Sequence, residues 1–172
     1  MKELSIMDFI DHASSMLLFK ALSKNELEKI FSAATAKEYA NNEKIIAKGE
    51  ISPSLFVVLE GTVNVSVPHG DAQPVFICSI GKGDVFGEAG IFLKVGRTAD
   101  VIAADNTVLF EITRDSLIGF IRQNPEAGIK ILMLIIYSLL RKLKEANQEL
   151  AFERKADISQ KDIDSIVSEV MG

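Results

Sequence analysis

Residues 83–103 read GDVFGEAGIFLKVGRTADVIA, and this stretch is the strongest sign of both fold and ligand. It carries one carboxylate, Glu88, and nine residues later one guanidinium, Arg97. Glycines at positions 83, 87 and 90 permit backbone conformations that a Cβ would hinder, so successive N–H groups can converge on an anion. The planar donor fork of an arginine suits a phosphate, and a carboxylate can accept hydrogen bonds from sugar hydroxyls. The stretch therefore predicts a pocket for a small phosphorylated sugar.

The order of these residues resembles the phosphate-binding cassette of the cyclic-nucleotide-binding domain family. This is the module of the catabolite activator protein and of the regulatory subunits of protein kinase A. The chain has Phe-Gly-Glu at 86–88, a short apolar insert, and Arg-Thr-Ala at 97–99, with the family's spacing. The resemblance extends upstream through Ile-x-x-Gly at 46–49 and the run 55–65, and it covers most of residues 17–150.

The resemblance also implies a role for each residue of the site. Glu88 and the backbone of Gly87 would hold the ribose 2′-hydroxyl, while Arg97 and nearby N–H groups would hold the cyclic phosphate. The ligand-binding residues expected in this way are Phe86, Gly87, Glu88, Ala89, Arg97, Thr98, Ala99 and Asn147. We expect no catalytic and no metal-binding residues.

Two positions depart from the family's pattern. Many members have proline immediately before the arginine and leucine directly after the glutamate, whereas this chain has Gly96 and Ala89. Neither change removes a group that contacts the ligand, so we expect weakened binding before lost binding.

The identity of the base depends on two polar residues. A hydroxyl directly after the arginine can reach a purine amino group, so Thr98 is compatible with guanine and with adenine. The long helix of the family supplies further base contacts, and here Asn147 is polar where its neighbour Ala146 is not. We favour cyclic AMP over cyclic GMP because it is the more frequent ligand in the family.

Short β-type runs separated by turn residues predict the fold class. These runs are residues 44–47, 55–59, 62–67, 75–79, 98–103 and 108–112. Many short strands at this spacing are typical of a barrel or jelly roll. The chain is therefore mainly β with flanking helices, and the family resemblance implies an antiparallel double-stranded β-roll.

Helical patterns lie on both sides of the strands. Ser23 and Glu26 have the spacing of a capping box at the start of an N-terminal helix. A longer helix is expected over 125–150, since Asn124-Pro125 is an N-cap followed by proline. Apolar residues recur every seven positions along it, which predicts a homodimer seam, although amphipathic helices often pack only within their own domain. We place one domain at 1–150 and a short helical tail at 151–172.

Composition restricts the class of protein. The 172 residues are 48% hydrophobic, with a net charge of −5, and no membrane span or signal peptide is visible. The single cysteine, Cys78, lies in an apolar run and favours a reducing, cytoplasmic setting with that thiol in the core. Acidic charge disfavours nucleic acid, and segment 151–172 is too short for a helix-turn-helix domain.

The sequence leaves two functions open. The first is a stand-alone, non-enzymatic cytoplasmic receptor in which a cyclic nucleotide changes the position of the long helix and so signals to an unknown downstream protein. The second is a ligand-free copy of the fold that serves as a dimerisation and interaction module. A jelly-roll metalloenzyme is disfavoured, because the two histidines, His12 and His69, have no partners at ligand spacing.

Overall fold

The chain consists of two units, residues 1–135 and residues 136–172. The computed structural model describes the backbone of residues 2–70, 72–93 and 95–171. Side chains are described for residue 5 and for residues 7–70, 72–93 and 95–152.

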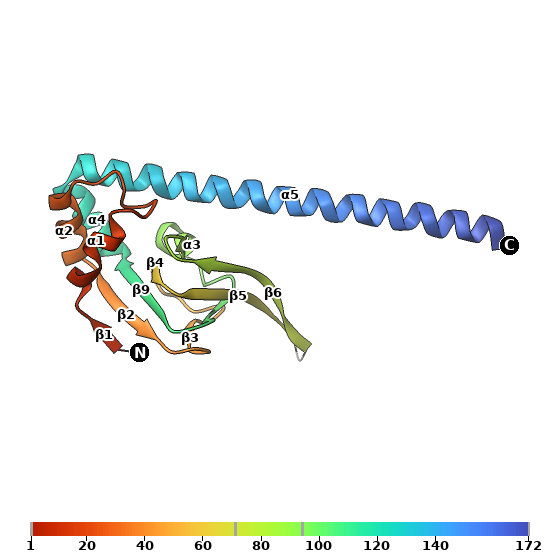
Figure 1. Cartoon of the computed structure of the whole chain (residues 1–172), viewed down its shortest axis with the longest axis horizontal. Coiled ribbons are helices and arrows are strands. Elements are labelled where there is room, and N and C mark those ends of the chain that lie inside the picture. Colours follow the sequence, from red (N-terminus) through yellow and green to blue (C-terminus); the bar gives the residue numbers. More distant parts are fainter. Residues whose placement is uncertain (1, 71, 94, 172) are drawn as a thin grey trace. The chain divides into compact units, whose positions relative to one another are not determined.

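The first unit is built on two antiparallel sheets (Figure 1). One sheet has the strand order β1-β2-β9-β4-β7, and the other has the order β3-β8-β5-β6. The strands are β1 (Lys2–Leu4), β2 (Thr35–Tyr39), β3 (Lys44–Ile46), β4 (Ser54–Glu60), β5 (Thr62–His69), β6 (Ala72–Gly81), β7 (Val85–Phe86), β8 (Asp100–Ala103) and β9 (Thr107–Thr113). Successive strands such as β4 and β5 lie in different sheets, so the chain rolls from one sheet to the other. This arrangement confirms the predicted β-roll with flanking helices.

Strand β4 lies between two hydrophobic cores. Its residues from Ser54 to Leu59 are all buried, and because strand side chains alternate, they divide between the two faces of the sheet. Leu55 and Val57 join the core under the helices, whereas Phe56 and Val58 join the core of the roll. Burial on both faces explains the unbroken apolar run in the sequence.

The core under the helices is closed by helical segments from both ends of the chain. The segments are η1 (Ile6–Phe9), α1 (Ile10–Ala13), α2 (Lys24–Ser32), α4 (Arg114–Gln123) and the start of α5 (Pro125–Met171). Phe19, Phe31 and Phe110 meet at its centre, with ring centroids 5.1 to 5.3 Å apart. Aromatic packing thus joins the N-terminal segment and α2 to strand β9.

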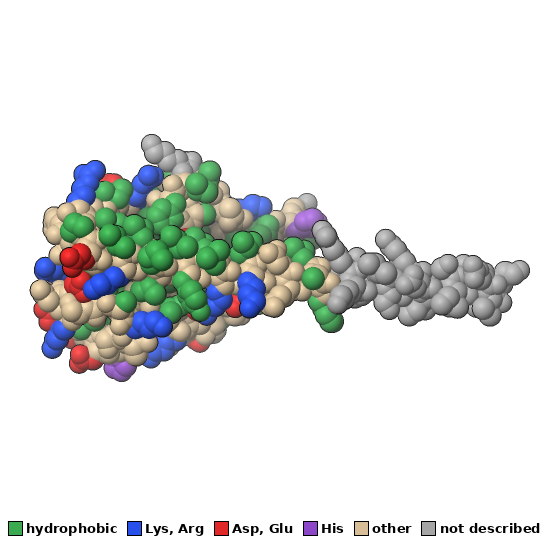
Figure 2. Space-filling view, turned by 90° about the horizontal axis from the view of Figure 1, so that it is seen from above, with side chains coloured by type: hydrophobic (Ala, Val, Ile, Leu, Met, Phe, Trp, Pro, Cys, Tyr) green, Lys and Arg blue, Asp and Glu red, His purple; other side chains and the backbone are tan. Residues whose placement is uncertain are grey.

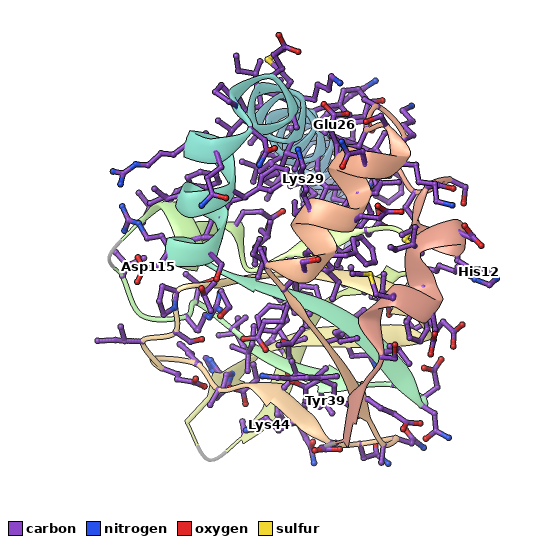
Figure 3. The ribbon with its side chains drawn as sticks, turned by 90° about the vertical axis from the view of Figure 1, so that its left-hand side faces the viewer. His12, Glu26, Lys29, Tyr39, Lys44 and Asp115 are labelled. Atoms are coloured by element: carbon purple, nitrogen blue, oxygen red, sulfur yellow. The ribbon has the colours of Figure 1, made fainter. Side chains whose placement is uncertain are left out.

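Helix α2 begins as predicted and is bonded to the junction of α4 and α5. Ser23 and Glu26 form the capping box, with the Ser23 N–H donating to Glu26 Oε2 at 2.7 Å. The same carboxylate accepts from Lys130 Nζ on α5 at 3.0 Å, and Lys29 Nζ donates to Asn124 Oδ1 at 3.0 Å. Figure 3 shows Glu26 and Lys29 along α2. Two polar bonds therefore hold α2 to the segment from which α5 starts.

Helix α5 differs from its predicted length. It is one continuous helix from Pro125 to Met171, where the sequence suggested an end near Leu150 and a separate short helix after it. No proline or glycine interrupts residues 129–171, so nothing in the backbone requires a break. The side chains of the predicted tail, beyond Phe152, lie outside the described residues.

Six elements and one side chain were not anticipated. The elements without a counterpart in the predicted pattern are β1, β2, β7, η1, α1 and α4. The prediction of a core position for Cys78 is wrong, because strand β6 is exposed along residues 72–79 and Cys78 with it. Strand β6 pairs only with β5 and forms the edge of its sheet, so an apolar run here does not mean burial.

Candidate functional site

The stretch that dominates the sequence forms a tight turn and a one-turn helix in the structure. Gly87 has φ of +83°, a left-handed conformation that favours glycine. It is the N-cap of α3 (Glu88–Phe92), whose first residue, Glu88, is only 7% exposed. A carboxylate this buried is unusual for an exposed connection between strands. The turn thus places Glu88 within the protein, next to strand β7.

Arg97 is also buried, with 6% of the residue exposed. Its Nη1 donates to the carbonyl of Gly87 at 3.1 Å, and its Nη2 donates to the carbonyl of Ser54 at 2.9 Å. Its Cζ lies 5.6 Å from the centre of the Phe56 ring, and that ring stacks on Phe86 at 5.0 Å. The guanidinium is therefore held by β4 on one side and by the cassette turn on the other.

Two glycines leave the space that the guanidinium occupies. A Cβ on Gly90 would lie 2.5 Å from Arg97 Nη1, and a Cβ on Gly87 would lie 2.8 Å from the same atom. Both distances are shorter than side-chain atoms tolerate. The glycines of the cassette thus serve the arginine directly, besides permitting the turn.

The backbone of Arg97 is fixed by a neighbouring turn. Its N–H donates to the carbonyl of Glu50 at 2.9 Å, and its carbonyl accepts from the Gly49 N–H at 2.8 Å. A Cβ at residue 96 would lie 2.9 Å from the Gly49 carbonyl oxygen. The glycine before the arginine, where many family members have proline, therefore has a local steric reason.

The positive charge of Arg97 lacks a close carboxylate. The ion pairs among the described side chains are Lys37–Glu111, Lys44–Asp100 and Lys130–Glu26, and none of them involves Arg97. Its Nε is buried and has no hydrogen-bond partner among the residues that the structure describes. Burial lowers the pKa of the Arg97 guanidinium, and more distant carboxylates, Glu50 first, act in the opposite direction. An anion that accepted a hydrogen bond from Nε would give this nitrogen a partner and the guanidinium a counter-ion.

The predicted site residues fall into three groups in the structure. Glu88 and Arg97 are both buried, and the carbonyl of Gly87, the residue before Glu88, accepts a hydrogen bond from Arg97. Phe86 is buried and stacked on Phe56, so its side chain supports the site from the core. The rest have accessible side chains or backbone: Ala89 and Thr98 are exposed, Ala99 is half-buried, and Asn147 is exposed on α5 in the second unit.

Sequence reasoning missed Ser54 and Phe56. Both lie in or beside the predicted strand 55–59, and both contact Arg97. The contribution of Ser54 is a backbone carbonyl, which leaves no trace in the residue type. An aromatic residue in an apolar strand reads as core, and only the fold brings Phe56 against a cation that follows it by more than 40 residues.

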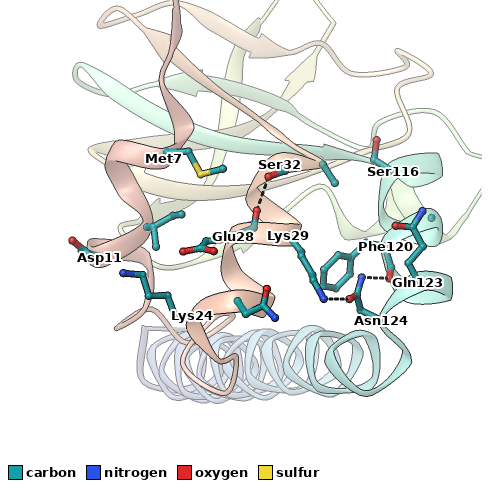
Figure 4. A pocket seen from close by; sticks show the side chains of 14 residues that line it. Met7, Asp11, Lys24, Glu28, Lys29, Ser32, Ser116, Phe120, Gln123 and Asn124 are labelled. Carbon is teal, nitrogen blue, oxygen red and sulfur yellow. Dashed lines mark hydrogen bonds between the residues drawn. The ribbon is translucent and has the colours of Figure 1, made fainter.

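One hollow of the structure lies away from the cassette. It has a volume of about 1070 Å³ and lies among α1, α2 and α4. Figure 4 shows Lys24, Glu28 and Lys29 of α2 on its lining, with Lys29 bonded to Asn124. No cassette residue lines this hollow, and its lining mixes both signs of charge with apolar side chains. The cassette, and not this hollow, is therefore the candidate ligand site.

The family match agrees with this geometry. Residues 36–124 match the model of the cyclic nucleotide-binding domain. The chain belongs to this family. The matched residues include strand β4, the whole cassette and Arg97, so the family's characteristic segment is the one that buries a carboxylate and a guanidinium here.

Curated relatives share the domain within longer proteins. Glutaminase 2 of Bradyrhizobium diazoefficiens is 32% identical over 139 residues, which cover 81% of this chain and 22% of that protein. The cyclic AMP receptor protein of Thermus thermophilus is 27% identical over 133 residues, which cover 77% of this chain and 60% of that protein. The chain thus spans less than two thirds of either relative.

Solved structures repeat the fold. A cyclic nucleotide-binding domain from Methylobacillus flagellatus has a TM-score of 0.76 at 20% identity and covers 86% of each chain. The catabolite activator protein of Thermus thermophilus has a TM-score of 0.68 at 26% identity, covering 79% of this chain and 62% of its own. Within the described residues, no helix combines the length and apolar character that a membrane span needs.

Proposed function

We propose that this chain is a regulatory receptor that binds a cyclic nucleotide at its cassette, cyclic AMP in preference to cyclic GMP. The observation that carries the proposal is Arg97, a buried cation with no ion pair among the described residues and with a buried Nε that lacks an acceptor. A phosphate that accepts from this nitrogen would neutralise the charge where water is largely excluded. Family membership supports the same ligand class.

The sugar would be recognised beside the phosphate. Glu88 is buried one residue after Gly87, whose carbonyl already accepts from Arg97. In the proposed complex the Glu88 carboxylate accepts from the ribose 2′-hydroxyl, and the N–H groups near Ala89, Thr98 and Ala99 donate to the phosphate. One ribose that carries a cyclic phosphate and a 2′-hydroxyl could therefore meet Arg97 and Glu88 at the same time.

The base would be read by fewer groups. Thr98 is exposed next to Arg97, and its hydroxyl can both donate to and accept from a purine. Asn147 remains a proposed second contact. The cyclic AMP receptor protein of Thermus thermophilus supports the preference for cyclic AMP, and a competition experiment between cyclic AMP and cyclic GMP tests it.

Signal output would pass through α5. The helix carries a stripe of exposed apolar side chains that includes most of the predicted seam (Figure 2): Ile129, Met133, Ile136, Tyr137, Leu140, Leu143 and Leu150. Ile129, Met133, Ile136, Leu140 and Leu143 recur at intervals of three and four residues, and Leu150 follows seven residues later. Such spacing suits a second helix, and we propose a homodimer through residues 125–150. Ligand binding would then favour one position of this helix over another. The downstream partner is a separate cytoplasmic protein, and this chain itself catalyses no reaction.

Titration calorimetry tests the ligand site. Wild-type protein is titrated with cyclic AMP and cyclic GMP, beside Arg97→Ala and a matched control, Arg122→Ala, which removes an exposed arginine of α4. Arg97→Ala should weaken binding at least tenfold, since each charge-assisted hydrogen bond is worth about 1.5 to 3 kcal/mol. Arg122→Ala should bind as wild type does. Equal binding by Arg97→Ala and wild type contradicts the proposed phosphate site.

Sedimentation and hydrogen exchange test the output. Ile136→Lys and Leu143→Lys should convert a dimer to a monomer in analytical ultracentrifugation, whereas Gln148→Lys, outside the seam, should not. Hydrogen exchange of residues 125–171 should change on saturation with the nucleotide. Unchanged exchange would leave a binding protein without the proposed switch. Absence of binding together with a stable dimer would instead favour the ligand-free interaction module.

A further inference from the structure

The side chain of Phe56 interacts with Arg97, and this interaction is separate from the contacts proposed between Arg97 and the phosphate. The ring is 4% exposed and belongs to the core of the roll. The Arg97 Cζ lies over it at 5.6 Å, within the range of a cation–π interaction. The arginine charge therefore lies within cation–π range of an aromatic face, and both residues are buried.

Phe56 is itself held in place by a second ring. It pairs with Phe86 across strands β4 and β7, and the two rings stack at 5.0 Å with an interplanar angle of 12°. A Cβ on Gly87 would lie 3.2 Å from the Phe56 ring as well as 2.8 Å from Arg97. The turn at Gly87 therefore has no room for a side chain between the Phe56 ring and the Arg97 guanidinium.

The remaining contacts fix the guanidinium in two directions but leave one rotation open. The carbonyls of Gly87 and Ser54 accept from Nη1 and Nη2, and a guanidinium held at these two nitrogens can still tilt about the line that joins them. Tilting would move Nε, the nitrogen without an acceptor among the described residues. A ring lying against the guanidinium opposes that tilt.

We propose that Phe56 is a positioning residue for the ligand phosphate: its ring, supported by Phe86, fixes the tilt of the Arg97 guanidinium and hence the direction in which Nε–H points. The inference rests on the proposed function for its effect on affinity. The geometric part, contact between the ring and the guanidinium, holds with or without a ligand. In this proposal Phe56 acts through Arg97 and does not itself contact the ligand.

Affinity is measured in a double-mutant cycle. Phe56→Leu, which keeps an apolar side chain but removes the ring, should weaken cyclic AMP binding about tenfold. In the Arg97→Ala background the same change should alter affinity less than twofold, because the group it positions is gone. Phe56→Tyr, which keeps the ring, should bind within twofold of wild type. Equal losses from Phe56→Leu in both backgrounds, or a Tyr variant as weak as the Leu variant, would overturn the proposal.

A control variant and a ligand-free readout complete the test. Phe110→Leu makes the same change in the core under the helices and should lower the melting temperature without weakening binding. In NMR spectra of the unliganded protein, the Arg97 Nε–H resonance should move downfield in Phe56→Leu, because the ring current is removed, and stay in place in Phe110→Leu. An unmoved resonance in Phe56→Leu refutes the positioning role. If wild type binds neither nucleotide, the proposed function fails, and the resonance still decides whether Phe56 contacts Arg97.

Discussion

Arg97 and Asp100 lie three residues apart, and the protein treats their charges in opposite ways. Asp100 accepts from the Lys48 N–H at 2.6 Å and from Lys44 Nζ at 2.9 Å, so its charge is matched at once. Arg97 is more deeply buried, yet it donates only to neutral carbonyls of the described residues. Asp100, whose charge is paired, holds a local turn together. Arg97, whose buried charge has no ion pair among the described residues, indicates a position for an anionic ligand.

The energetic side of the contrast follows from solvation. The Asp100 side chain is 13% exposed and its partner Lys44 is 53% exposed, so the pair keeps some contact with water and contributes little beyond its hydrogen bonds. Burying a guanidinium without a counter-ion is costly, and the protein offsets part of that cost with two carbonyls and an aromatic face. The lowered pKa of Arg97, caused first by burial, has the same origin. The contrast therefore predicts that Asp100 contributes mainly to stability and Arg97 mainly to affinity for the proposed nucleotide.

The largest effect is expected from a substitution that fills the space beside the Arg97 guanidinium. In Gly90→Ala the new Cβ would lie 2.5 Å from Arg97 Nη1 and 2.9 Å from Cζ, so the guanidinium must move. Since this displaces the groups that would meet the phosphate, we expect nucleotide affinity to fall at least tenfold, as it would on losing a charge-assisted hydrogen bond. Overpacking should also lower the free energy of unfolding by about 1 to 3 kcal/mol. Titration calorimetry and urea denaturation measure the two effects.

The matched control is the same substitution in another helix. Gly119 lies inside α4, and a Cβ there would meet nothing within 4 Å. Gly119→Ala should therefore raise stability by up to about 1 kcal/mol and leave affinity unchanged. If Gly90→Ala bound nucleotide as tightly as Gly119→Ala, the guanidinium would not be tied to the ligand.

A second test compares the two charges directly through stability. Asp100→Ala removes the acceptor of two hydrogen bonds and should lower the unfolding free energy by about 2 kcal/mol. Arg97→Met removes a buried charge, which stabilises, and leaves two carbonyls without donors, which destabilises. These effects oppose each other, so we expect a net loss below about 1 kcal/mol in the unliganded protein. Urea denaturation without nucleotide measures both variants.

The opposite ranking would change the interpretation. If Arg97→Met were the more damaging of the two, the arginine would serve mainly to brace β4 against the cassette. Its missing counter-ion would then be a structural compromise, and the case for a ligand would rest on family membership alone.

The site was predictable from the sequence to the extent that it is local. Gly87, Glu88 and Arg97 lie within one short stretch, and their spacing indicated a carboxylate and a cation in one site. The family resemblance supplied the roll, which strand spacing alone could not choose from other jelly rolls. What the pattern could not give was the position of β4, since the contacts of Ser54 and Phe56 with Arg97 join segments more than 40 residues apart.

The missed elements have different physical causes. Strand β2 reads Thr-Ala-Lys-Glu-Tyr, and its charged residues conceal a strand that is fixed by pairing, with Lys37 bonded to Glu111 of β9. Helix α4 does have local signals, because Thr113 caps it and Leu117 and Phe120 are buried at helical spacing. Cys78 shows the reverse error, in which an apolar run lies on an exposed edge strand. Whether a strand lies at the edge or in the centre of a sheet depends on the topology of the sheet, and the residue types of one strand do not reveal it.

The smallest expected effect is a difference between Asp100 and Arg97 in how their contributions to stability depend on pH. Hydrogen bonds from the Lys48 N–H and Lys44 Nζ lower the pKa of Asp100 below its ordinary value of 3.8. A carboxyl with a depressed folded pKa contributes stability that is present above the unfolded pKa and is lost as pH falls through the folded one. Asp100→Asn keeps an acceptor but never ionises, so it should be less stable than wild type by under about 1 kcal/mol at pH 7.

This difference between wild type and Asp100→Asn should shrink as pH falls below 3.8, and urea denaturation of both proteins between pH 7 and pH 3 measures it. Other carboxylates titrate in the same range, Glu26 and Glu43 among them, and comparison of the two variants cancels their contribution. The pair Arg97→Met and wild type should narrow less, because the guanidinium stays charged throughout and the carboxylates of the described residues that act on it, Glu50 first, form no ion pair with it. A constant Asp100 difference would mean that its partners hold the side chain by shape and hydrogen bonding, with the charge itself contributing nothing.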